Sequence, residues 1–443
     1  MITDQQINQS VNKFVQNKKI PLGINTYKGN KADKEHIVSL PYMENGSIVI
    51  IGSSGWGKSV LLKRLVDYYL GVYKNKNKGL IIDTQGVDHR LSVLQNPNPH
   101  PLFYNHGEQP LKIDNIKSYC PIFASKKSIE GDKIIGISLM DLMPYDLRSS
   151  TMSDQSIMEF YKIKREDPIN RKVMSDPVLF YNEVSKLKSS KQMENESALV
   201  YPSQMINYAI KESMMRVFSW WSGYQPLDEE KPKHMDNLQW ELQKRPPYFV
   251  DEKDKNHYPT FWNDYNNNEI VLLNFMDAKE EREAMNIYGG YFLRDIYDYC
   301  TYESRKNTKF KGVFIAVEES NLFIDKEDKY LRKGSNFYFT ELLCRGFKFE
   351  VLMLADFQSI TTINSEIRDF LTSGQNPVII GNLTKNDREY LNYIFPGIKD
   401  LKLRKHVPGK EWGGKEWAVY YNDKDYDTFV PYPSLSKYHK RGK

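Results

Sequence analysis

A glycine-rich loop near the N-terminus constrains this chain more than any other feature. Residues Gly52 to Ser59 read G-S-S-G-W-G-K-S, which matches the pattern G-x-x-x-x-G-K-[S/T]. The loop lies between the apolar run 48–51 and a segment with a helical pattern, 60–70. A strand, a glycine-rich turn and a helix in this order direct backbone N–H groups and a helix N-terminus toward a phosphate. The sequence therefore predicts a site for a nucleoside triphosphate.

The residues of this loop have separate expected roles. The glycines allow backbone N–H groups to curl around the phosphates, and the Lys58 ammonium reaches the β and γ oxygens. The Ser59 hydroxyl is expected to take a Mg²⁺ position. The predicted nucleotide-binding set is Gly52, Ser53, Ser54, Gly55, Trp56, Gly57, Lys58 and Ser59.

Apolar runs of strand length alternate with helical patterns along much of the chain. Strands are expected at 20–23, 36–40, 48–51, 79–83, 269–275, 313–317, 350–355, 376–381 and 416–421. Helices are expected at 60–70, at 278–305 and through 339–343. This alternation predicts an α/β fold with a mostly parallel sheet covered by helices on both faces. Together with the loop, it predicts a phosphate-loop NTPase of the RecA-like, additional-strand type.

The 443 residues are best divided into one core and one large insertion. Residues 1–47 hold an amphipathic segment (Ile7, Val11, Phe14, Val15) and lead-in strands, and residues 48–88 form the first part of the core. From 89 to 265 the strand pattern weakens and helical stretches such as 204–221 occur, so a mainly helical insertion is expected. Residues 266–443 complete the core and end in a basic tail.

The composition indicates no membrane span. Mean hydropathy is −0.62, and no apolar run approaches the roughly 20 residues that a span requires. The N-terminus has no basic segment followed by an apolar one, so no secretory signal is expected. Cys120, Cys300 and Cys344 are far apart and form no C-x-x-C pair, which is typical of a reducing compartment without zinc. We therefore expect a cytoplasmic protein, in the host cytoplasm if the gene is viral.

The charge balance does not by itself indicate nucleic acid. The chain has 62 basic and 57 acidic residues, for a formal net charge of +5. A path for a polyanion would have to come from local clusters, for which 126–127, 186–191 and 437–441 are candidates. Such lysine runs are also typical of solvated faces.

Acidic and amide side chains follow two of the expected strands. Glu318 and Glu319 come directly after 313–317, and Gln358 follows 350–357. Hydrolysis of a triphosphate requires one carboxylate near the metal and one group that orients or deprotonates the attacking water. We assign Glu318 to the metal together with Ser59, Glu319 to the water, and Gln358 to sensing the γ-phosphate.

The order of these motifs resembles the HerA/FtsK superfamily of ring-forming DNA-pumping ATPases. The stretch 317–323, V-E-E-S-N-L-F, is similar to the Asp-Glu-Ala-His-Asn stretch of that family, and 356–359, D-F-Q-S, resembles its Thr-Gln signature. The resemblance covers about residues 20–435. Two departures stand out: Glu318 replaces the usual Asp, and the chain ahead of Gly52 is too short for the β-barrel of cellular HerA proteins. The second departure favours a packaging or conjugation relative.

The resemblance implies a function, cofactors and partners. It implies ATP and Mg²⁺ as cofactors, a homo-oligomeric ring of six subunits, and translocation of double-stranded DNA in genome packaging, conjugative transfer or DNA processing. A nuclease, a portal or a membrane channel would be a further partner. It also gives Arg345, just before the Gln358 strand, the role of an arginine finger that enters the neighbouring subunit's site, with Arg368 in reserve.

Two alternatives remain open. A secretion-type ATPase on the same fold would hydrolyse ATP without a response to DNA. A GTPase switch would use 83–86, D-T-Q-G, and 384–387, T-K-N-D, which match an Asp-x-x-Gly switch and a variant guanine-reading loop. About 300 residues separate these two elements, and no effector strand fits before Asp83. The GTPase interpretation also leaves Glu318, Glu319 and Gln358 without a role.

Overall fold

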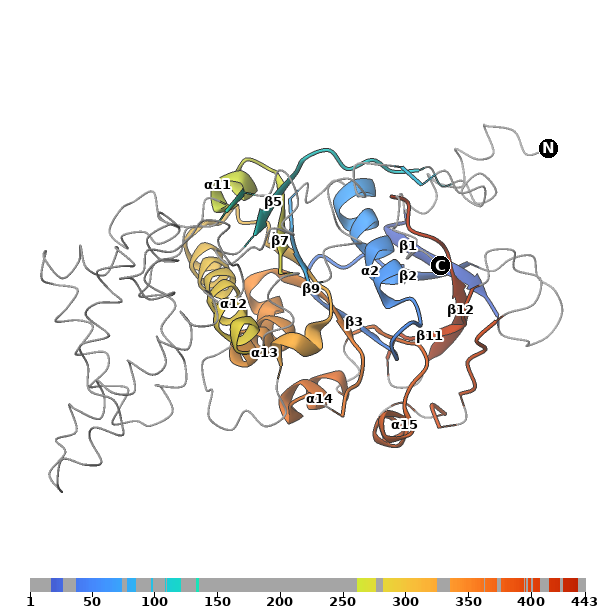
Figure 1. The fold of residues 1–443 in the computed structure, drawn as a ribbon. Coiled ribbons are helices and arrows are strands. Elements are labelled where there is room, and N and C mark those ends of the chain that lie inside the picture. Colours follow the sequence, from blue (N-terminus) through green and yellow to red (C-terminus); the bar gives the residue numbers. More distant parts are fainter. Residues whose placement is uncertain are drawn as a thin grey trace, which may run out of the picture.

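The structure is a computed structural model, and only part of the chain is described (Figure 1). The described residues are 17–26, 37–73, 78–84, 97–98, 108, 110–120, 133–134, 261–275, 282–324, 335–361, 363–372, 376–393, 395, 397–399, 401–406, 414–422 and 425–436. Within the expected insertion, 89–265, this leaves mainly its two ends. The helical stretch 204–221, the amphipathic segment before residue 17 and the pair Gln85-Gly86 lie outside the described residues.

All the named strands belong to one 12-stranded sheet. Its strand order is β2-β1-β12-β11-β10-β3-β9-β8-β4-β7-β5-β6. The strands are β1 (Lys19–Asn25), β2 (Ile37–Pro41), β3 (Gly46–Ile51), β4 (Leu80–Asp83), β5 (Ile116–Cys120), β6 (Lys133–Ile134), β7 (Ile270–Asn274), β8 (Val313–Val317), β9 (Val351–Phe357), β10 (Val378–Ile380), β11 (Trp417–Tyr420) and β12 (Tyr426–Pro431).

The sheet has a parallel part and an antiparallel part. From β10 to β6 every neighbouring pair is parallel, and from β10 through β11, β12 and β1 to β2 every pair is antiparallel. The central strands β3, β4, β7, β8 and β9 are buried along almost their whole length. Near-continuous apolar runs are typical of parallel strands that are covered on both faces, which is the pattern that the sequence predicts.

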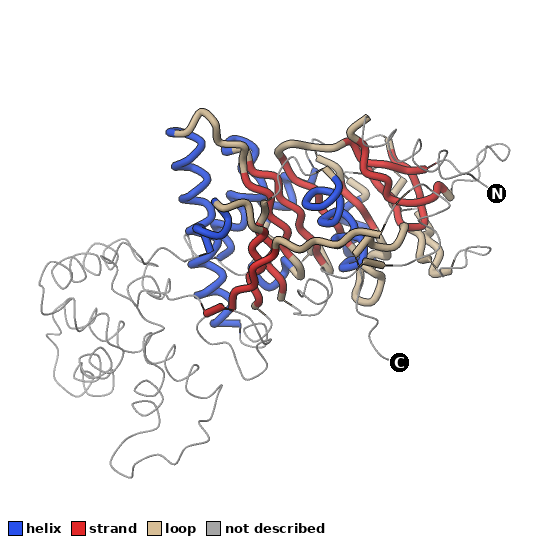
Figure 2. Tube along the Cα trace, turned by 90° about the horizontal axis from the view of Figure 1, so that it is seen from above, coloured by secondary structure: helices blue, strands red, loops and turns tan. Residues whose placement is uncertain are grey.

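Helices cover both faces of this sheet. The described helices are α2 (Lys58–Val66), which continues as a π-helical turn η1 (Asp67–Val72), α11 (Phe261–Asn266), α12 (Arg282–Lys306), α13 (Ser335–Arg345), α14 (Ser365–Thr372) and α15 (Lys385–Leu391), with the 3-10 turns η3 (Ser320–Phe323) and η4 (Gly346–Phe349). Alternate strand residues divide between two cores, one shared with α2 and one shared with α11, α12, α13 and α14. The arrangement can be followed in Figures 1 and 2.

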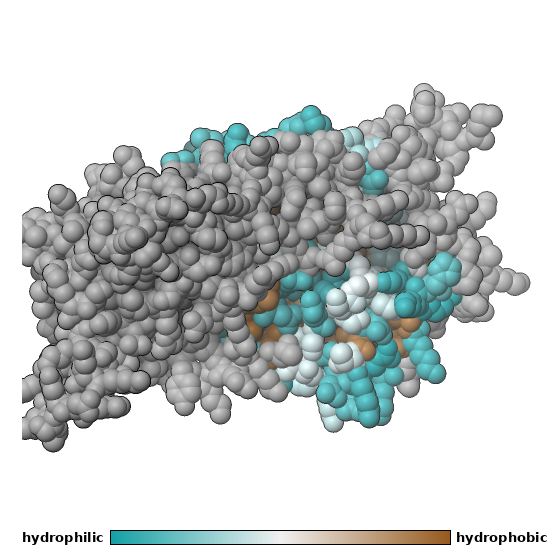
Figure 3. Space-filling view, viewed as in Figure 1, coloured by the Kyte–Doolittle hydropathy of each residue, from teal (hydrophilic) through white to brown (hydrophobic). Residues whose placement is uncertain are grey.

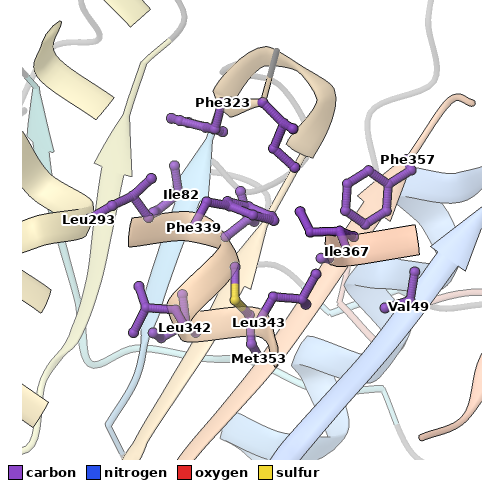
Figure 4. Packing of buried hydrophobic residues seen from close by; sticks show 14 of the residues in the cluster. Val49, Ile82, Leu293, Phe323, Phe339, Leu342, Leu343, Met353, Phe357 and Ile367 are labelled. Carbon is purple, nitrogen blue, oxygen red and sulfur yellow. The ribbon is translucent and has the colours of Figure 1, made fainter. Parts of the chain in front are cut away.

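The core beneath α12 and α13 is the larger of the two. In Figure 4, Phe339, Leu342 and Leu343 of α13 point toward the sheet, where Ile82 and Met353 lie. On the face shown in Figure 3, the described surface is mostly hydrophilic, with small separate apolar patches. In the part of the chain that the structure describes, no helix is both long and apolar enough to cross a membrane.

All nine expected strands are present, and the expected α/β fold is confirmed. Three strands were not expected: β5, β6 and β12. β5 (I-K-S-Y-C) lies within the range 89–265 and nevertheless pairs in parallel with β7 of the core. It has no continuous apolar run such as those of the central strands, and its alternation of apolar and polar residues over five positions is a short signal that pairing with β7 fixes as a strand. The division of the chain into core and insertion otherwise stays a prediction.

Candidate nucleotide site

The glycine-rich loop begins where β3 ends, at the carboxyl edge of the parallel strands. The N–H of Gly52 donates to the carbonyl of Phe357 on β9 (3.0 Å), and the N–H of Ser53 donates to the carbonyl of Asn382 after β10 (2.8 Å). Both neighbouring strands therefore fix the entry of the loop. Gly55 and Gly57 have backbone φ angles of +72° and +100°, which residues with a Cβ rarely adopt. Lys58 opens α2 directly after them, so the helix N-terminus faces the loop as predicted.

Trp56 anchors the loop to the last strands of the sheet. Its side chain is buried, and its Nε1 donates to the carbonyl of Glu416 (3.2 Å) just before β11. The Lys415 ammonium lies 5.3 Å from the centroid of the Trp56 ring and donates to the Gly55 carbonyl. A Cβ on Gly381 would lie 2.4 Å from the Trp56 ring. In the predicted nucleotide-binding set, the Trp56 side chain is thus directed into the protein.

Lys58 lies among acidic side chains that come from the ends of two strands, β8 and β9. Its side chain is largely buried, and burial lowers its pKa, while nearby carboxylates, led by that of Asp356, act in the opposite direction. The two others that act on it are Glu319 and Glu318. The fold therefore brings together Lys58, Glu318 and Glu319, as the sequence predicts. Asp356, the first residue of the D-F-Q-S stretch and one with no predicted catalytic role, belongs to the same group.

Glu318 is the most deeply buried carboxylate of the predicted pair, with 1% of its surface exposed. Burial raises the pKa of its carboxyl well above the ordinary value, the charge of Asp83 raises it further, and the Ser59 hydroxyl acts in the opposite direction. No described residue donates a hydrogen bond of ordinary geometry to either carboxylate oxygen of Glu318, although the Ser59 hydroxyl and the Asp83 carboxyl lie beside it. Buried oxygens next to the Ser59 hydroxyl fit the hydration shell of a Mg²⁺ ion, which protein sites hold through one or two oxygens and the phosphates.

Glu319 has a left-handed backbone, with φ 50° and ψ 51°, where β8 turns into η3. This conformation is unfavourable for a residue with a Cβ and persists only when its surroundings impose it, which is frequent at functional sites. Asp356 supplies the constraint, because its carboxylate accepts the N–H of Glu319 and that of Ser320. Burial raises the pKa of Asp356 to about 7, although Lys58 and these N–H groups act to lower it. The turn directs the Glu319 carboxylate toward Thr84, whose Oγ1 is 3.5 Å from Oε2.

Gln358 is exposed at the end of β9, directly beside the start of the glycine-rich loop. Its backbone N–H donates to Oδ1 of Asn321 (2.6 Å), and Nδ2 of Asn321 donates to the carbonyl of Ser359 (3.1 Å). One asparagine side chain therefore joins the turn after Glu319 to the loop that carries Gln358. The sequence contains Asn321 within the V-E-E-S-N-L-F stretch, but no local pattern predicts this role.

Arg345 lies at the other edge of the sheet. It is the last residue of α13, and β9 runs from there to Gln358 over roughly 20 Å. Its guanidinium pairs with Glu341 and, at 2.7 Å, with Glu366, and about half of its side chain is exposed. Arg345 therefore does not contact the nucleotide site of its own chain. That it enters the site of a neighbouring subunit as an arginine finger stays a prediction. Arg368, the reserve candidate, lies 5.2 Å from the Tyr390 ring centroid.

Asp387, the residue that a GTPase would use to read guanine, is completely buried. Its Oδ1 accepts the Ser359 hydroxyl (2.7 Å) and the N–H groups of Ile360 (3.0 Å) and Thr361 (3.2 Å). Its Oδ2 accepts the Thr384 hydroxyl (2.7 Å), while Thr384 caps α15. Asp387 thus holds the loop after Gln358 in place and does not present an oxygen to a purine base.

We expect Asp387→Ala to lower stability without changing the preference between ATP and GTP. The change leaves two backbone N–H groups, one of them buried, and two hydroxyls without this acceptor, and hydrogen bonds to a charged group are worth about 1.5–3 kcal/mol each. Thermal unfolding and competition between the two nucleotides measure the two effects. Asn386→Ala, at the exposed neighbouring position, is the matched control. A selective loss of GTP binding in Asp387→Ala would contradict this interpretation.

Comparison with known proteins gives distant structural similarity only. No protein-family model and no curated protein match the chain. A structure of VirB4 of Thermoanaerobacter pseudethanolicus is similar with 13% identity and a TM-score of 0.46, covering 93% of this chain and 96% of the other. The genome packaging NTPase B204 from Sulfolobus turreted icosahedral virus 2, in complex with ATP-gammaS, has 9% identity and a TM-score of 0.33, covering 88% and 98%.

A third similar structure contains ATPases 2 and 3 of EssC from Geobacillus thermodenitrificans. It has 9% identity and a TM-score of 0.30, and it covers 96% of this chain and 46% of the other. These similarities are too distant to assign an activity, so the functional argument depends on the residues of the site. The glycine-rich loop after β3, the parallel strands beside it and the carboxylates at their ends are features of this chain itself. They give it the fold of a phosphate-loop NTPase.

Proposed function

We propose that this chain is an ATP-hydrolysing motor that assembles as a ring and translocates double-stranded DNA. The observation that carries the proposal is the meeting of Lys58, Glu319 and Gln358 beside one glycine-rich loop, although they come from distant parts of the sequence. A binding protein for nucleotides would need the loop alone. A buried metal carboxylate, a second carboxylate held on a constrained turn and an amide at the next strand end are what hydrolysis requires.

In this proposal the residues divide the work. Lys58 and the loop backbone hold the phosphates, and Ser59 and Glu318 hold Mg²⁺, which neutralises charge on the phosphate oxygens when it is bound. Glu319 orients the attacking water and accepts its proton, and Gln358 contacts the γ-phosphate. Arg345 would complete the site of a neighbouring subunit, which is the reason for proposing a ring.

The position of Asp387 argues against the GTPase alternative. Because its carboxylate is buried and occupied, the T-K-N-D stretch cannot read guanine as it would in a GTPase. The secretion-type ATPase remains the second candidate, since it would use the same site. It differs from the DNA motor only in what the hydrolysis drives.

The test is steady-state hydrolysis of ATP and of GTP by the purified protein, with and without linear double-stranded DNA. We expect selective ATP turnover that DNA stimulates and that Lys58→Ala abolishes, because the lysine is the only cation placed at the phosphates by the described part of the loop. Lys385→Ala, at an exposed lysine on α15, is the control and should retain full turnover. ATP turnover that DNA does not stimulate would favour the secretion-type ATPase. Absence of turnover would contradict the proposal.

A further inference from the structure

A polar cavity lies at the edge of the sheet opposite the nucleotide site. Its volume is about 440 Å³, and its lining comes from the segments that precede β4, β7 and β8 and from the end of α12. Because these strands are parallel, their starts share one edge, while Asp83, Asn274 and Glu318 follow or complete them at the other. The strand length places this amino-edge cavity roughly 15 Å or more from the glycine-rich loop. It is therefore separate from the site described above.

The charged groups of the amino-edge cavity are mostly positive. Three lysines, Lys78, Lys309 and Lys311, line it together with one acid, Glu303, which leaves an excess of two positive charges. Asn307 donates to the Glu303 carboxylate through Nδ2 (3.1 Å), so part of that single negative charge is already engaged. Lysines that gather in a concave site without matching acids attract anions.

Lys78 is the anchor of this group. Its ammonium lies 4.6 Å from the centroid of the buried Tyr265 ring, which fixes the position of the charge. Burial lowers its pKa, Glu303 acts in the opposite direction, and the charge of Lys311 lowers it again. Lys78 and Lys311 are thus close enough to repel each other, and a bound anion would relieve that repulsion.

The remaining lining includes three asparagine amides and the Tyr299 hydroxyl, beside Phe310 and Gly312. Oδ1 of Asn266 accepts the Tyr299 hydroxyl (2.8 Å), which orients the amide and leaves its NH₂ group to donate. Hydrogen-bond donors beside lysines are the groups that contact phosphate oxygens in nucleic-acid complexes. The volume lies within the range of ligand sites, about 300–1,000 Å³.

We propose that the amino-edge cavity binds a phosphate of a nucleic-acid backbone through Lys78, Lys309 and Lys311. It deepens the proposed function, on which it rests, by giving the DNA a contact on the edge of the sheet remote from the nucleotide. Contacts of this kind position a nucleic acid without reading its sequence. A free polyphosphate offers the same chemistry, and the experiment separates the two sources.

The experiment measures binding of a fluorescently labelled linear duplex to the full chain, without nucleotide, between about 50 and 200 mM salt. We expect Lys309→Gln with Lys311→Gln to reduce the slope of log affinity against log salt by about 2, because each lost phosphate contact removes about 0.9. Both lysines are exposed, so the fold should persist, which thermal unfolding checks. Lys385→Gln with Lys399→Gln removes the same charge from other exposed positions and is the matched control.

A second arm identifies the source of the phosphate. Calorimetry with inorganic tripolyphosphate is carried out on Lys58→Ala, with and without the two lysine changes. Loss of tripolyphosphate binding with an unchanged duplex slope would overturn the nucleic-acid assignment in favour of a free phosphate compound. A slope that falls equally in the control pair would overturn the site, and so would an unchanged slope together with unchanged tripolyphosphate binding. Hydrolysis without DNA should stay unchanged in Lys309→Gln with Lys311→Gln, so failure of the ATPase proposal in the wild type is a separate outcome.

Discussion

Glu319→Gln is expected to reduce ATP turnover by about 10²- to 10⁴-fold, the usual contribution of a general base. The amide keeps the size of the side chain and its place near Thr84 but cannot accept a proton from the attacking water. Binding of ATP should persist, because Lys58, Ser59 and the loop backbone are unchanged. Turnover and nucleotide affinity measured on the same preparation therefore separate the two effects.

Glu350→Gln is the matched control for this change. Glu350 is also a glutamate with a left-handed backbone, φ 58°, but it lies at the amino edge of the sheet, where it accepts a hydrogen bond from Asn45 (3.3 Å). The same substitution at the same kind of backbone should leave turnover within about twofold, since surface changes away from a site are usually near neutral. Equal losses in both variants would point to a general effect on the fold. Full activity of Glu319→Gln would remove Glu319 as the base.

Arg64→Met is expected to lower the free energy of unfolding by about 3–5 kcal/mol, the cost of removing one partner of a buried ion pair. Arg64 is fully buried on α2 and pairs with Glu108, which is itself almost completely buried. Its guanidinium also donates to the carbonyls of Pro21 (2.7 Å) and Pro433 (2.6 Å). Methionine fills much of the volume but removes the cation that pairs with Glu108, which keeps only the Tyr68 hydroxyl as a donor, and it removes the Arg64 donors from both carbonyls.

Thermal unfolding measures this effect, with an expected fall in Tm of about 4 °C, because the entropy of unfolding grows with chain length. Arg345→Met is the control, because Arg345 also forms two carboxylate pairs but is about half exposed. Exposed pairs contribute about 0–1 kcal/mol, so its Tm should change little. Adding Glu108→Leu to Arg64→Met removes the unpaired charge and should recover part of the loss. Equal shifts in Arg64→Met and Arg345→Met would contradict the role of the buried network.

Residues 433–436 contact the helix that follows the glycine-rich loop, through Arg64 and through Asp67. Asp67, in the π-helical turn that follows α2, accepts the N–H (2.9 Å) and the hydroxyl (2.6 Å) of Ser436. Burial raises the pKa of Asp67, while Lys63 and the Ser436 hydrogen bonds act to lower it. Hydrogen bonds thus join α2 and the turn after it to Pro21 and to residues 433–436. No local pattern around Arg64 or Asp67 predicts these partners.

The sequence by itself determined the glycine-rich loop, the central strands and the positions of Glu318, Glu319 and Gln358 at strand ends. Apolar runs such as 48–51 and 313–317 can be recognised locally, because a strand covered on both faces must be apolar along its whole length. Parallel strands then bring their carboxyl ends to one edge. The meeting of the glutamates with Lys58 follows from that geometry once the strands are known.

Only the tertiary structure decided what holds those residues in place. The left-handed turn of Glu319 depends on Asp356, 37 positions away, and the Gln358 loop depends on Asn321 and on Asp387, at similar distances along the chain. Asp387 in sequence resembles a guanine-reading residue, and burial makes it a structural one. The amino-edge cavity likewise gathers lysines from separate segments. The sequence alone does not distinguish a carboxylate or amide that binds a ligand from one that holds the fold. The partners of the side chain make that distinction, and they come from distant segments that pack together.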